Sequence, residues 1–343
     1  MRSEQSVVVF SLAISRALPF TPAEAIAHPA ATPIAVLIPC YNEAAAIGAV
    51  VRDFRAALPN ATVHVYDNNS TDDTVAVARS AGAVIGRETL QGKGNVVRRM
   101  FADIEADIYV LVDGDGTYDA TAAPTLVAAL LRDRLDMINC SRIGGGGKAY
   151  RPGHRFGNVV LSGLIGQVFG KRFRDTLSGY KLFSRRFVKS FPAHATGFDI
   201  EPELVVHALE LGMPVREIET AYGQRPMGSV SKLRTVRDGI QVLWTIAILV
   251  KEERPLSFFG WIFLVLAAVS MLLAAPVVAT YSETGLVPRF PTAILATGIM
   301  LLAFLSLTCG LILDTVTRGR REMKHMRYLS IPAARAAAPD DEH

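Results

Sequence analysis

The sequence predicts an α/β protein in which a mostly parallel β-sheet is followed by two transmembrane helices. Short apolar runs alternate with helix-forming segments through residues 33–235, and polar turns follow the apolar runs. Two long uncharged runs lie nearer the carboxyl end. Half of the 343 residues are hydrophobic, but the charged residues are concentrated before position 256. The chain therefore divides into a polar α/β part and an apolar part.

The expected strands and helices alternate along the polar part. Strands are expected at 34–38, 62–66, 83–86, 108–112, 137–140 and 215–222. Helices are expected at 44–58, 75–80, 92–104, 123–131 and 197–211. Asn42 is placed to cap the first of these helices. Such alternation predicts right-handed crossovers between parallel strands, and ligands bind beyond the carboxyl ends of strands connected in this way.

An acidic turn follows the fourth expected strand. Asp113 and Asp115 are separated by Gly114, so two carboxylates leave the strand close enough to share one Mg²⁺ or Mn²⁺, ions that prefer oxygen ligands. Taken alone, Asp-Gly-Asp-Gly is also a common polar turn. The other polar positions expected at this edge of the sheet are 39–43, 67–73 and Lys93. Their convergence favours the metal site over the simple turn.

Three more segments carry hypotheses of their own. Four glycines at 144–147, followed by basic residues, indicate a mobile basic lid, with a flexible linker as the alternative. Residues 157–170 are uncharged but too short to cross a bilayer, so they suit either a helix in the membrane interface or a buried core helix. Residues 224–232 place two cations and two hydroxyls on a glycine turn, which suits phosphate oxygens, although a solvated loop has the same composition.

The uncharged runs at 258–281 and 290–313 are each long enough to cross a bilayer. At about 1.5 Å per residue a helix over either run exceeds the roughly 30 Å hydrocarbon core. Lys and Arg are sparse between the runs and frequent on either side of them. The positive-inside rule therefore predicts two transmembrane helices with both termini in the cytosol. Two buried core helices are the alternative.

The charge argues against a nucleic-acid-binding protein, and the cysteine content argues against a disulfide framework. The net charge of +4 is small and dispersed, so we expect no nucleic-acid partner. The three cysteines show no paired spacing, which fits a reducing compartment.

Residues 1–32 are expected to be an extension lying on the domain or the membrane, with a weak signal peptide as the alternative. Residues 236–257 are expected to form a juxtamembrane interfacial helix and linker, and residues 314–343 a basic cytosolic tail.

Four motifs carry a family resemblance. They are Pro39-Cys-Tyr-Asn-Glu43, Asp67-Asn-Asn-Ser-Thr-Asp-Asp-Thr74, Asp113-Gly-Asp115, and Arg225 with Ser231-Lys232. Together they resemble the polyprenyl (dolichyl) phosphate glycosyltransferases, family-2 glycosyltransferases with a GT-A fold of which some have two carboxyl-terminal transmembrane helices. The resemblance covers residues 33–315. It departs from the family in a loop before Lys232 that is longer by one residue, and in Thr117, which stands where some relatives have a Gln that supports the metal.

The resemblance implies a role for each matching residue. Residues of the nucleotide-sugar pocket would be Pro39, Tyr41, Asn42, Glu43, Asp67, Asn68, Lys93, Asp113 and Gly114. Metal ligands would be Asp113, Asp115 and Thr117. The acceptor phosphate would be bound by Arg142, Arg225, Ser229, Ser231 and Lys232. Catalytic residues would be Asp115 and Arg225, with Asp199 and Glu201 orienting the acceptor or acting as a base.

The implied activity is inverting transfer of a sugar from a UDP- or GDP-linked donor to a polyprenyl phosphate. It would take place at the cytosolic face of the inner (cytoplasmic) membrane, with the bilayer as a further partner and a homo-oligomer compatible with the sequence. A phosphate monoester with a second pKa of about 6 is already ionised in the cytosol, so no general base is obligatory. Two alternatives are transfer to a lipid hydroxyl, which needs Asp199 or Glu201 as a base, and an inactive membrane-anchored nucleotide-sugar-binding protein. A processive synthase is disfavoured because Gln224-Arg225-Pro226 lacks the Trp of Gln-x-x-Arg-Trp.

Overall fold

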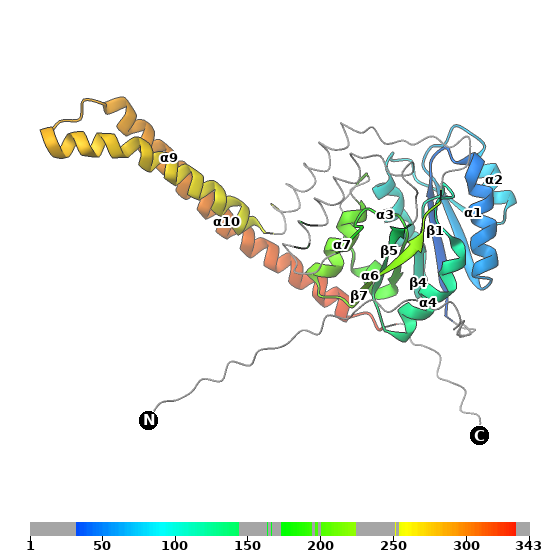
Figure 1. The fold of residues 1–343 in the computed structure, drawn as a ribbon. Helices are drawn as coiled ribbons and strands as arrows, with labels where there is room; N and C mark the ends of the chain where they lie inside the picture. The colour runs from blue at the N-terminus through cyan, green and yellow to red at the C-terminus, as the bar shows by residue number, and fades with distance from the viewer. Residues whose placement is uncertain are drawn as a thin grey trace, which may run out of the picture.

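The structure is a computed structural model that describes residues 32–143, 173–193, 196–197, 200–223 and 254–333, as well as Gly163, Gly166 and Lys251. It comprises an α/β domain and a long helical hairpin (Figure 1). The helices of the domain are α1 (Ala44–Ala57), α2 (Thr74–Ser80), α3 (Lys93–Asp103), the 3-10 helix η1 (Ala120–Ala122), α4 (Ala123–Arg132), α6 (Arg185–Ser190) and α7 (Ile200–Glu210). The hairpin consists of α9 (Pro255–Thr284) and α10 (Phe290–Leu329).

Within the described residues, seven strands form one mixed sheet. They are β1 (Ile34–Cys40), β2 (Ala61–Asp67), β3 (Val84–Arg87), β4 (Ile108–Leu111), β5 (Met137–Ile143), β6 (Lys181–Ser184) and β7 (Val215–Ala221). Their order across the sheet is β3-β2-β1-β4-β6-β5-β7, and every neighbouring pair is parallel except the two that include β6. The predicted mostly parallel sheet is confirmed. β6 was not expected, because four residues that follow a polar loop and lead directly into α6 are too few to show a periodicity.

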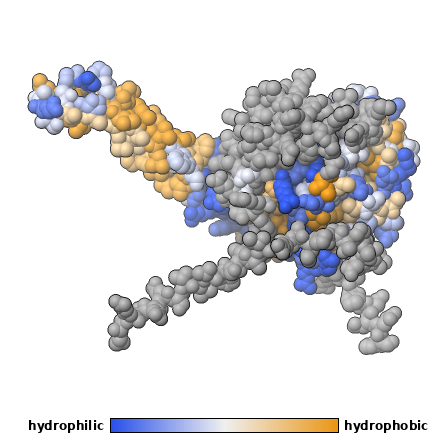
Figure 2. All heavy atoms as spheres, in the orientation of Figure 1, coloured by the Kyte–Doolittle hydropathy of each residue, from blue (hydrophilic) through white to orange (hydrophobic). Residues whose placement is uncertain are grey.

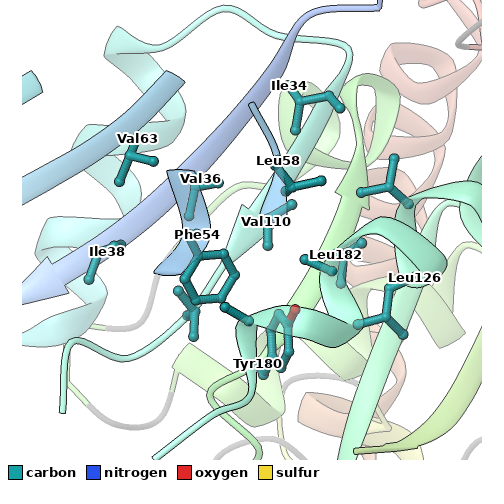
Figure 3. Close-up of a cluster of buried hydrophobic side chains, with 14 of the residues drawn as sticks. Ile34, Val36, Ile38, Phe54, Leu58, Val63, Val110, Leu126, Tyr180 and Leu182 are labelled. Carbon is teal, nitrogen blue, oxygen red and sulfur yellow. The ribbon is translucent and has the colours of Figure 1, made fainter. Parts of the chain in front are cut away.

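The sheet separates two hydrophobic cores. Along β1, Val36 and Ile38 belong to the core shared with α1 and α4, whereas Ala35 and Leu37 belong to the core shared with α3 and α7. Figure 3 shows the first of these cores, in which side chains from β1 and β4 lie close to Phe54 of α1. The alternation follows from the two-residue period of a strand, which sends successive side chains to opposite faces. A sheet covered on both faces presents only its edges to ligands.

The start of α1 differs from the expectation. Asn42 was predicted to cap this helix, but Glu43 is the N-cap residue and makes no side-chain capping hydrogen bond. Asn42 has a φ of 52°, and its side-chain oxygen accepts a hydrogen bond from Thr71 N at 2.7 Å. The first backbone groups of the helix are bound from the loop after β2 instead: Glu43 N donates to Thr74 Oγ1 at 2.8 Å and Ala44 N donates to Asp72 Oδ2 at 3.2 Å. The turn and the loop are therefore fixed to each other.

The helices α9 and α10 form a hairpin with an apolar surface (Figure 2). Both are long and apolar enough to cross a membrane, and only 17% of the most apolar window of each is buried. Large side chains such as Trp261 and Leu272 are 70% and 74% exposed. A core helix of a water-soluble domain would bury such a surface, so the helices indicate association with a membrane. Small residues lie where the two helices meet: Ser270 Oγ donates to Ala296 O at 2.7 Å, and a Cβ on Gly310 would be 3.0 Å from Phe259 Cβ.

α10 is longer than its apolar run. The second span was expected over 290–313 and a tail over 314–343, but the helix continues to Leu329. Helix propensity does not depend on hydrophobicity, and Arg, Lys and Met are good helix formers. We call residues 314–329 the stem. The stem contacts the α/β domain beside α6.

Candidate active site

The polar site is assembled at one edge of the sheet. In the register of the parallel strands Cys40 lies opposite Asp67, and Leu37 lies opposite Leu111, so β1, β2 and β4 end along the same edge. β6 begins there, because it runs antiparallel and Lys181 pairs with Leu111. Val112 N donates to Leu37 O at 3.0 Å and continues the pairing by one residue. The predicted carboxylates Asp113 and Asp115 then leave the sheet at this edge, as expected.

Gly114 separates these two carboxylates at a position that has no room for a side chain. A Cβ at this position would lie 2.6 Å from Cys40 Sγ and 3.3 Å from Ile38 Cγ2. The backbone of the acidic turn is therefore packed directly on the end of β1. This contact explains why glycine, rather than any residue with a Cβ, separates Asp113 from Asp115.

A lysine bridges two carboxylates in the site. Lys93 Nζ, at the start of α3, lies 2.5 Å from Asp113 Oδ1 and also forms an ion pair with Glu201 at the start of α7. The side chains of Lys93 and Glu201 are only 9% and 6% exposed, and that of Asp113 is 31% exposed. Three segments that are distant in sequence thus meet in one cluster of charges.

The charges of this cluster depend on one another. Burial lowers the pKa of Lys93, but Asp113 and Glu201 more than reverse this and raise it above its ordinary value. Burial raises the pKa of Glu201, more than the neighbouring Lys93 lowers it. The Oε2 atom of Glu201 is buried and has no hydrogen-bond partner among the described residues. A buried polar atom of this kind costs free energy unless a hydrogen-bond partner binds it, so Glu201 is the least satisfied member of the cluster.

Asp115 is held by Thr117. Its Oδ1 atom accepts hydrogen bonds from Thr117 N at 3.2 Å and from Thr117 Oγ1 at 2.6 Å, and both residues are buried. Thr117 therefore orients the carboxylate of Asp115. That Thr117 is itself a metal ligand stays a prediction. Its carbonyl oxygen also accepts a hydrogen bond from Gly223 N at 2.8 Å, which connects the acidic turn to the end of β7.

A glycine faces the other carboxylate. A Cβ on Gly179 would lie 2.1 Å from Asp113 Oδ2, so the loop before β6 approaches Asp113 as only glycine can. Gly179 N donates to Tyr118 Oη at 2.8 Å, and the Tyr118 ring packs edge-on against Tyr180 and Tyr222. The loop is thereby fixed over the acidic turn.

Arg142 is paired with a carboxylate that the sequence analysis did not single out. Its Nε and Nη2 atoms donate to the two oxygens of Asp175 at 2.6 and 2.8 Å, and the guanidinium lies 5.4 Å from the Tyr222 ring centroid. Burial raises the pKa of Asp175, but its hydrogen bonds and ion pair with Arg142 outweigh burial and lower it. Arg142 was predicted to bind the acceptor phosphate. In the structure its positive charge is partly balanced by Asp175.

A buried polar network supports the loop that carries Asp175. Asn139 Nδ2 donates to Asp175 O at 2.9 Å and to Glu217 Oε1 at 3.0 Å, and Glu217 accepts a hydrogen bond from Asp175 N. Lys181, which is fully buried, donates to Asn139 Oδ1. Burial lowers the pKa of Lys181 to about 8. In the sequence, Asn139 is a polar residue within an apolar run, whereas Lys181 and Glu217 carry no comparable signal, because β6 was not expected and β7 contains other charged residues.

The polar turns after β1 and β2 lie at the same edge, but some of their side chains have structural partners. Asp67 accepts hydrogen bonds from Ser70 N at 3.2 and 3.3 Å. Asn68 donates to Glu88 O and Leu90 O and accepts from Gly92 N at 2.7 Å, so its amide holds the loop that leads to Lys93. Pro39 pairs with Tyr66 in the register, Glu43 is nearly buried, and Tyr41 is partly buried. Their role in nucleotide binding stays a prediction.

Several predicted site residues lie outside the described part of the chain. They are Asp199, Arg225, Ser229, Ser231 and Lys232, together with the glycine run 144–147. Most of the segment 157–170 also lies outside it. The phosphate-binding loop and the lid therefore stay predictions.

The donor set fits a hard divalent cation. Within the described residues no three His, Cys, Asp or Glu side chains form a metal cluster, so the protein would supply the carboxylates of Asp113 and Asp115. Magnesium typically binds one or two carboxylates and completes its shell with water and substrate phosphates. The ammonium of Lys93 against Asp113 shows that this carboxylate already stabilises a cation. The residues present therefore fit a metal that is shared with a diphosphate.

A mixed sheet in this order, with an acidic turn at the end of β4, defines a GT-A glycosyltransferase domain. The model of glycosyl transferase family 2 matches residues 35–191. The glycosyltransferase AglJ of Haloferax volcanii is 35% identical over 233 residues, which are 66% of this chain and 75% of that protein. The chain belongs to glycosyl transferase family 2.

Two further relatives differ in the molecules that they are named for. A dolichyl-phosphate hexose transferase of Haloferax volcanii is 26% identical over 222 residues, which are 64% of this chain and 95% of that protein. A crystal structure of glucosyl-3-phosphoglycerate synthase from Mycobacterium tuberculosis, in complex with Mn²⁺, UDP and glucosyl-3-phosphoglycerate, is 25% identical with a TM-score of 0.50. It covers 65% of this chain and 80% of that chain. One of these names contains a lipid phosphate, dolichyl phosphate, and the other contains a small phosphate, phosphoglycerate.

Proposed function

We propose that the chain transfers a sugar from a nucleotide-sugar donor to a polyprenyl phosphate at the membrane surface, with inversion at the anomeric carbon. The observation that carries this proposal is that one chain contains both the cluster of charged residues around Asp113 and an exposed apolar hairpin. A water-soluble acceptor would not require a membrane-associated enzyme, whereas a lipid phosphate presents its reactive group at the bilayer surface. The dolichyl-phosphate hexose transferase among the relatives supports the same acceptor class.

On the donor side, Asp113 and Asp115 would hold Mg²⁺ or Mn²⁺ against the diphosphate. The bound metal would supply positive charge to the departing nucleoside diphosphate. Lys93 would provide a second positive charge, because its ammonium is buried beside Asp113 and has its pKa raised by the carboxylates around it. The Mn²⁺ and UDP of the mycobacterial synthase support this arrangement. Asp67 and the segment Pro39–Glu43 are the proposed nucleoside pocket.

On the acceptor side, the phosphate would arrive already ionised, since its second pKa is about 6. The protein would then need to position it and exclude water rather than remove a proton. Arg142 and the loop residues Arg225, Ser231 and Lys232 are proposed to bind the phosphate. Glu201, whose buried Oε2 atom has no hydrogen-bond partner among the described residues, is proposed to orient the acceptor. A lipid hydroxyl would instead require Glu201 or Asp199 to act as a base, which makes the identity of the acceptor decisive for the mechanism.

By the positive-inside argument, the domain and both termini are proposed to be cytosolic, on an inner membrane crossed by α9 and α10. The flanks of the hairpin carry Lys251, Arg254, Arg318, Arg320 and Arg321, whereas Arg289 and Glu283 are the charged residues near its turn. A reporter fused after residue 333 should stay inaccessible in sealed cells. Labelling of that reporter from outside would contradict the orientation without affecting the acceptor.

A panel of acceptors tests the activity. Purified protein in lipid vesicles would be incubated with radiolabelled UDP- and GDP-sugars, Mg²⁺ or Mn²⁺, and one of four acceptors: polyprenyl phosphate, polyprenol, diacylglycerol or 3-phosphoglycerate. We expect a labelled lipid product with polyprenyl phosphate alone, and we expect loss of that product with chelator or in Asp115→Ala. Product on polyprenol or diacylglycerol would favour the hydroxyl acceptor. Full activity of Asp115→Ala, or no transfer with any donor, would refute the proposal.

A further inference from the structure

The stem joins the membrane hairpin to the domain through buried charges. Tyr328 Oη donates to Asp136 Oδ2 at 2.7 Å, and Arg186 forms an ion pair with the same carboxylate while its guanidinium lies 4.8 Å from the Tyr328 ring centroid. Asp136 is fully buried and also accepts a hydrogen bond from Ser184 Oγ at 2.7 Å. A buried carboxylate is tolerated only when it is fully paired. The stem therefore completes a polar site of the domain instead of resting on its surface.

A second anchor lies further along the stem, toward the hairpin. Glu210, the last residue of α7, has a side chain that is 2% exposed, and it forms ion pairs with Arg321 at 3.2 Å and Lys324 at 2.8 Å. Arg321, Lys324 and Tyr328 follow at spacings of three and four residues, so they occupy one face of the helix. Arg318 belongs to another environment: its side chain is 75% exposed and pairs with Asp314 of the same helix. One face of the stem is thus bound to the domain at two points.

The two anchors lie at the end of the sheet away from the site. Asp136 immediately precedes β5, and its N donates to Pro214 O next to the start of β7, so both lie at the amino ends of these parallel strands. From Tyr328 back to Asp314 a helix rises about 21 Å. A strand of the length of β5, with 7 residues, spans about 23 Å. The stem of α10 is therefore about as long as a strand of the sheet, and Figure 1 shows it running obliquely past α6 and α7.

α7 connects the stem to the site. Glu201 near its first turn pairs with Lys93, and Glu210 at its last turn pairs with the stem. An α-helix of this length is a stiff rod of about 15 Å. The position of the hairpin and the position of the charged cluster are thus linked through one short helix.

We propose that the stem is a rigid strut that sets the height and orientation of the charged cluster above the lipid surface, and that Asp136 and Glu210 are the positioning residues that anchor it. The inference rests on the proposed membrane-borne acceptor. A lipid phosphate is confined to a thin layer at the bilayer surface, so the charged cluster must be held at that level, and a misplacement of a few ångströms is costly in rate. Two-point docking of a continuous helix provides this constraint, whereas a flexible linker would not.

A change in the length of the strut tests the proposal. Seven helix-forming residues inserted after Val316 add about 10 Å and two turns, and they return the docking face to within about 20° of its original direction. The matched control carries the same insertion in the turn after Gly285, at the opposite end of the hairpin. Transfer to long-chain polyprenyl phosphate in vesicles would be compared with transfer to a short-chain, water-soluble polyprenyl phosphate in detergent.

We expect the stem insertion to lower the vesicle rate by about tenfold or more and to change the soluble rate by less than about twofold. The control insertion should change neither. A second pair of variants avoids insertions: Arg321→Gln with Lys324→Gln releases Glu210, and Arg318→Gln removes an exposed cation from the same helix. We expect the variant with Arg321→Gln and Lys324→Gln to lose activity in vesicles and to keep its activity on the soluble acceptor. Arg318→Gln should keep both activities. Equal vesicle rates in the wild type and the stem insertion would overturn the strut.

A distance measurement separates this inference from the proposed function. A fluorophore on Leu90→Cys, which lies in the exposed loop before Lys93 at the site edge, would transfer energy to a labelled lipid in vesicles, in a Cys309→Ser background. The stem insertion should lengthen the separation by about 10 Å, with no change in the control insertion. An unchanged separation overturns the strut even if transfer to lipid phosphate is observed. A lengthened separation without any transfer by the wild type supports the strut and refutes the acceptor.

Discussion

Gly179 lies so close to Asp113 that no other residue fits at its position. A Cβ on Gly179 would be 2.1 Å from Asp113 Oδ2 and 2.6 Å from its Cγ. The backbone on one side of this contact is held by Tyr118, through the hydrogen bond from Gly179 N. The carboxylate on the other side is held by Lys93. Both partners are held by other residues, so the contact fixes the direction of a proposed metal ligand.

We expect Gly179→Ala to weaken Mn²⁺ binding and transfer by about tenfold or more, because the new methyl group forces the Asp113 carboxylate aside. Binding would be measured by electron paramagnetic resonance of Mn²⁺, in the presence and absence of UDP. Gly223→Ala is the control, since among the described residues a Cβ there would meet only Thr117 O, at 3.7 Å. Equal Mn²⁺ affinities for the wild type and Gly179→Ala would show that Asp113 is not oriented by this glycine.

Lys93 should stabilise the fold as well as the ligand. Lys93→Met leaves the carboxylates of Asp113 and Glu201 facing each other without their shared cation. Removing one partner of a buried ion pair typically costs about 3 to 5 kcal/mol, so we expect a clear fall in Tm. Because a divalent cation can replace the missing charge, Mn²⁺ should raise the Tm of Lys93→Met more than that of the wild type.

The double variant Lys93→Met with Glu201→Gln provides the internal check. It removes one of the two opposed carboxylates, so it should recover part of the lost Tm, and the coupling follows from a double-mutant cycle. Purely additive losses in the two single variants would argue that the Lys93–Glu201 contact contributes nothing to stability. The cycle does not require the enzyme to be active.

Much of the site could be predicted from the sequence because it lies at strand ends. The apolar runs before Asp67 and Asp113 predict parallel strands, and the register of β1 with β2 and β4 then places their polar turns at one edge. Burial on both faces of the sheet produces the short continuous apolar runs from which the strands were predicted. The convergence of Lys93 with Asp113 follows from the same topology, since α3 begins at this edge.

The remaining features depend on contacts with no periodic signal. Arg142 and Asp175 are far apart in sequence, and their ion pair exists because β6 returns antiparallel between β4 and β5. The capping of α1 by Thr74 and Asp72 is likewise a contact between two loops. The docking of Tyr328 on Asp136 requires α10 to continue past its apolar run, which hydropathy alone does not indicate.

Asp175 should make the protein sensitive to acid. Its pKa is lowered, because its hydrogen bonds and ion pair with Arg142 outweigh burial. A carboxyl with a depressed folded-state pKa contributes stability that is present above its unfolded pKa of about 4 and is lost as the pH falls through the folded value. We expect the Tm of Asp175→Asn to lie below that of the wild type at pH 7, and the difference to shrink as the pH falls below about 4.

The comparison for Asp175 is a thermal melt in detergent at steps from pH 7 to pH 3.5. Asp133→Asn is the comparison for a more exposed pair, since Asp133 pairs with Arg132 and Arg216 and its side chain is 23% exposed, against 6% for Asp175. If the difference in Tm between the wild type and Asp175→Asn stays constant across this range, the ion pair of Asp175 with Arg142 is not the cause of the loss of stability in acid.

Lys181 should affect the stability of the protein at alkaline pH. The ammonium is fully buried beneath the Asp175 loop and donates to Asn139 Oδ1 and, at 3.4 Å, to Thr176 O. Burial lowers its pKa to about 8, so between about pH 8 and pH 10.5 the unfolded chain binds more protons than the folded one at this position. Stability must therefore rise with pH across this window, by up to about 3 kcal/mol from this group. Lys181→Met has no proton to lose and should lack that rise.

The quantity to measure is the Tm of the wild type minus that of Lys181→Met, at steps from pH 7.5 to pH 10.5. Tyrosines and cysteines titrate in both proteins and cancel in the difference. We expect the difference to increase with pH, because only the wild type sheds a buried charge. Lys189→Met, which removes a lysine paired with Glu105, controls for the general loss of a cation. A difference that stays flat or falls with pH would mean that Lys181 is as easily charged in the folded protein as in water, and that its network with Asn139 compensates fully for burial.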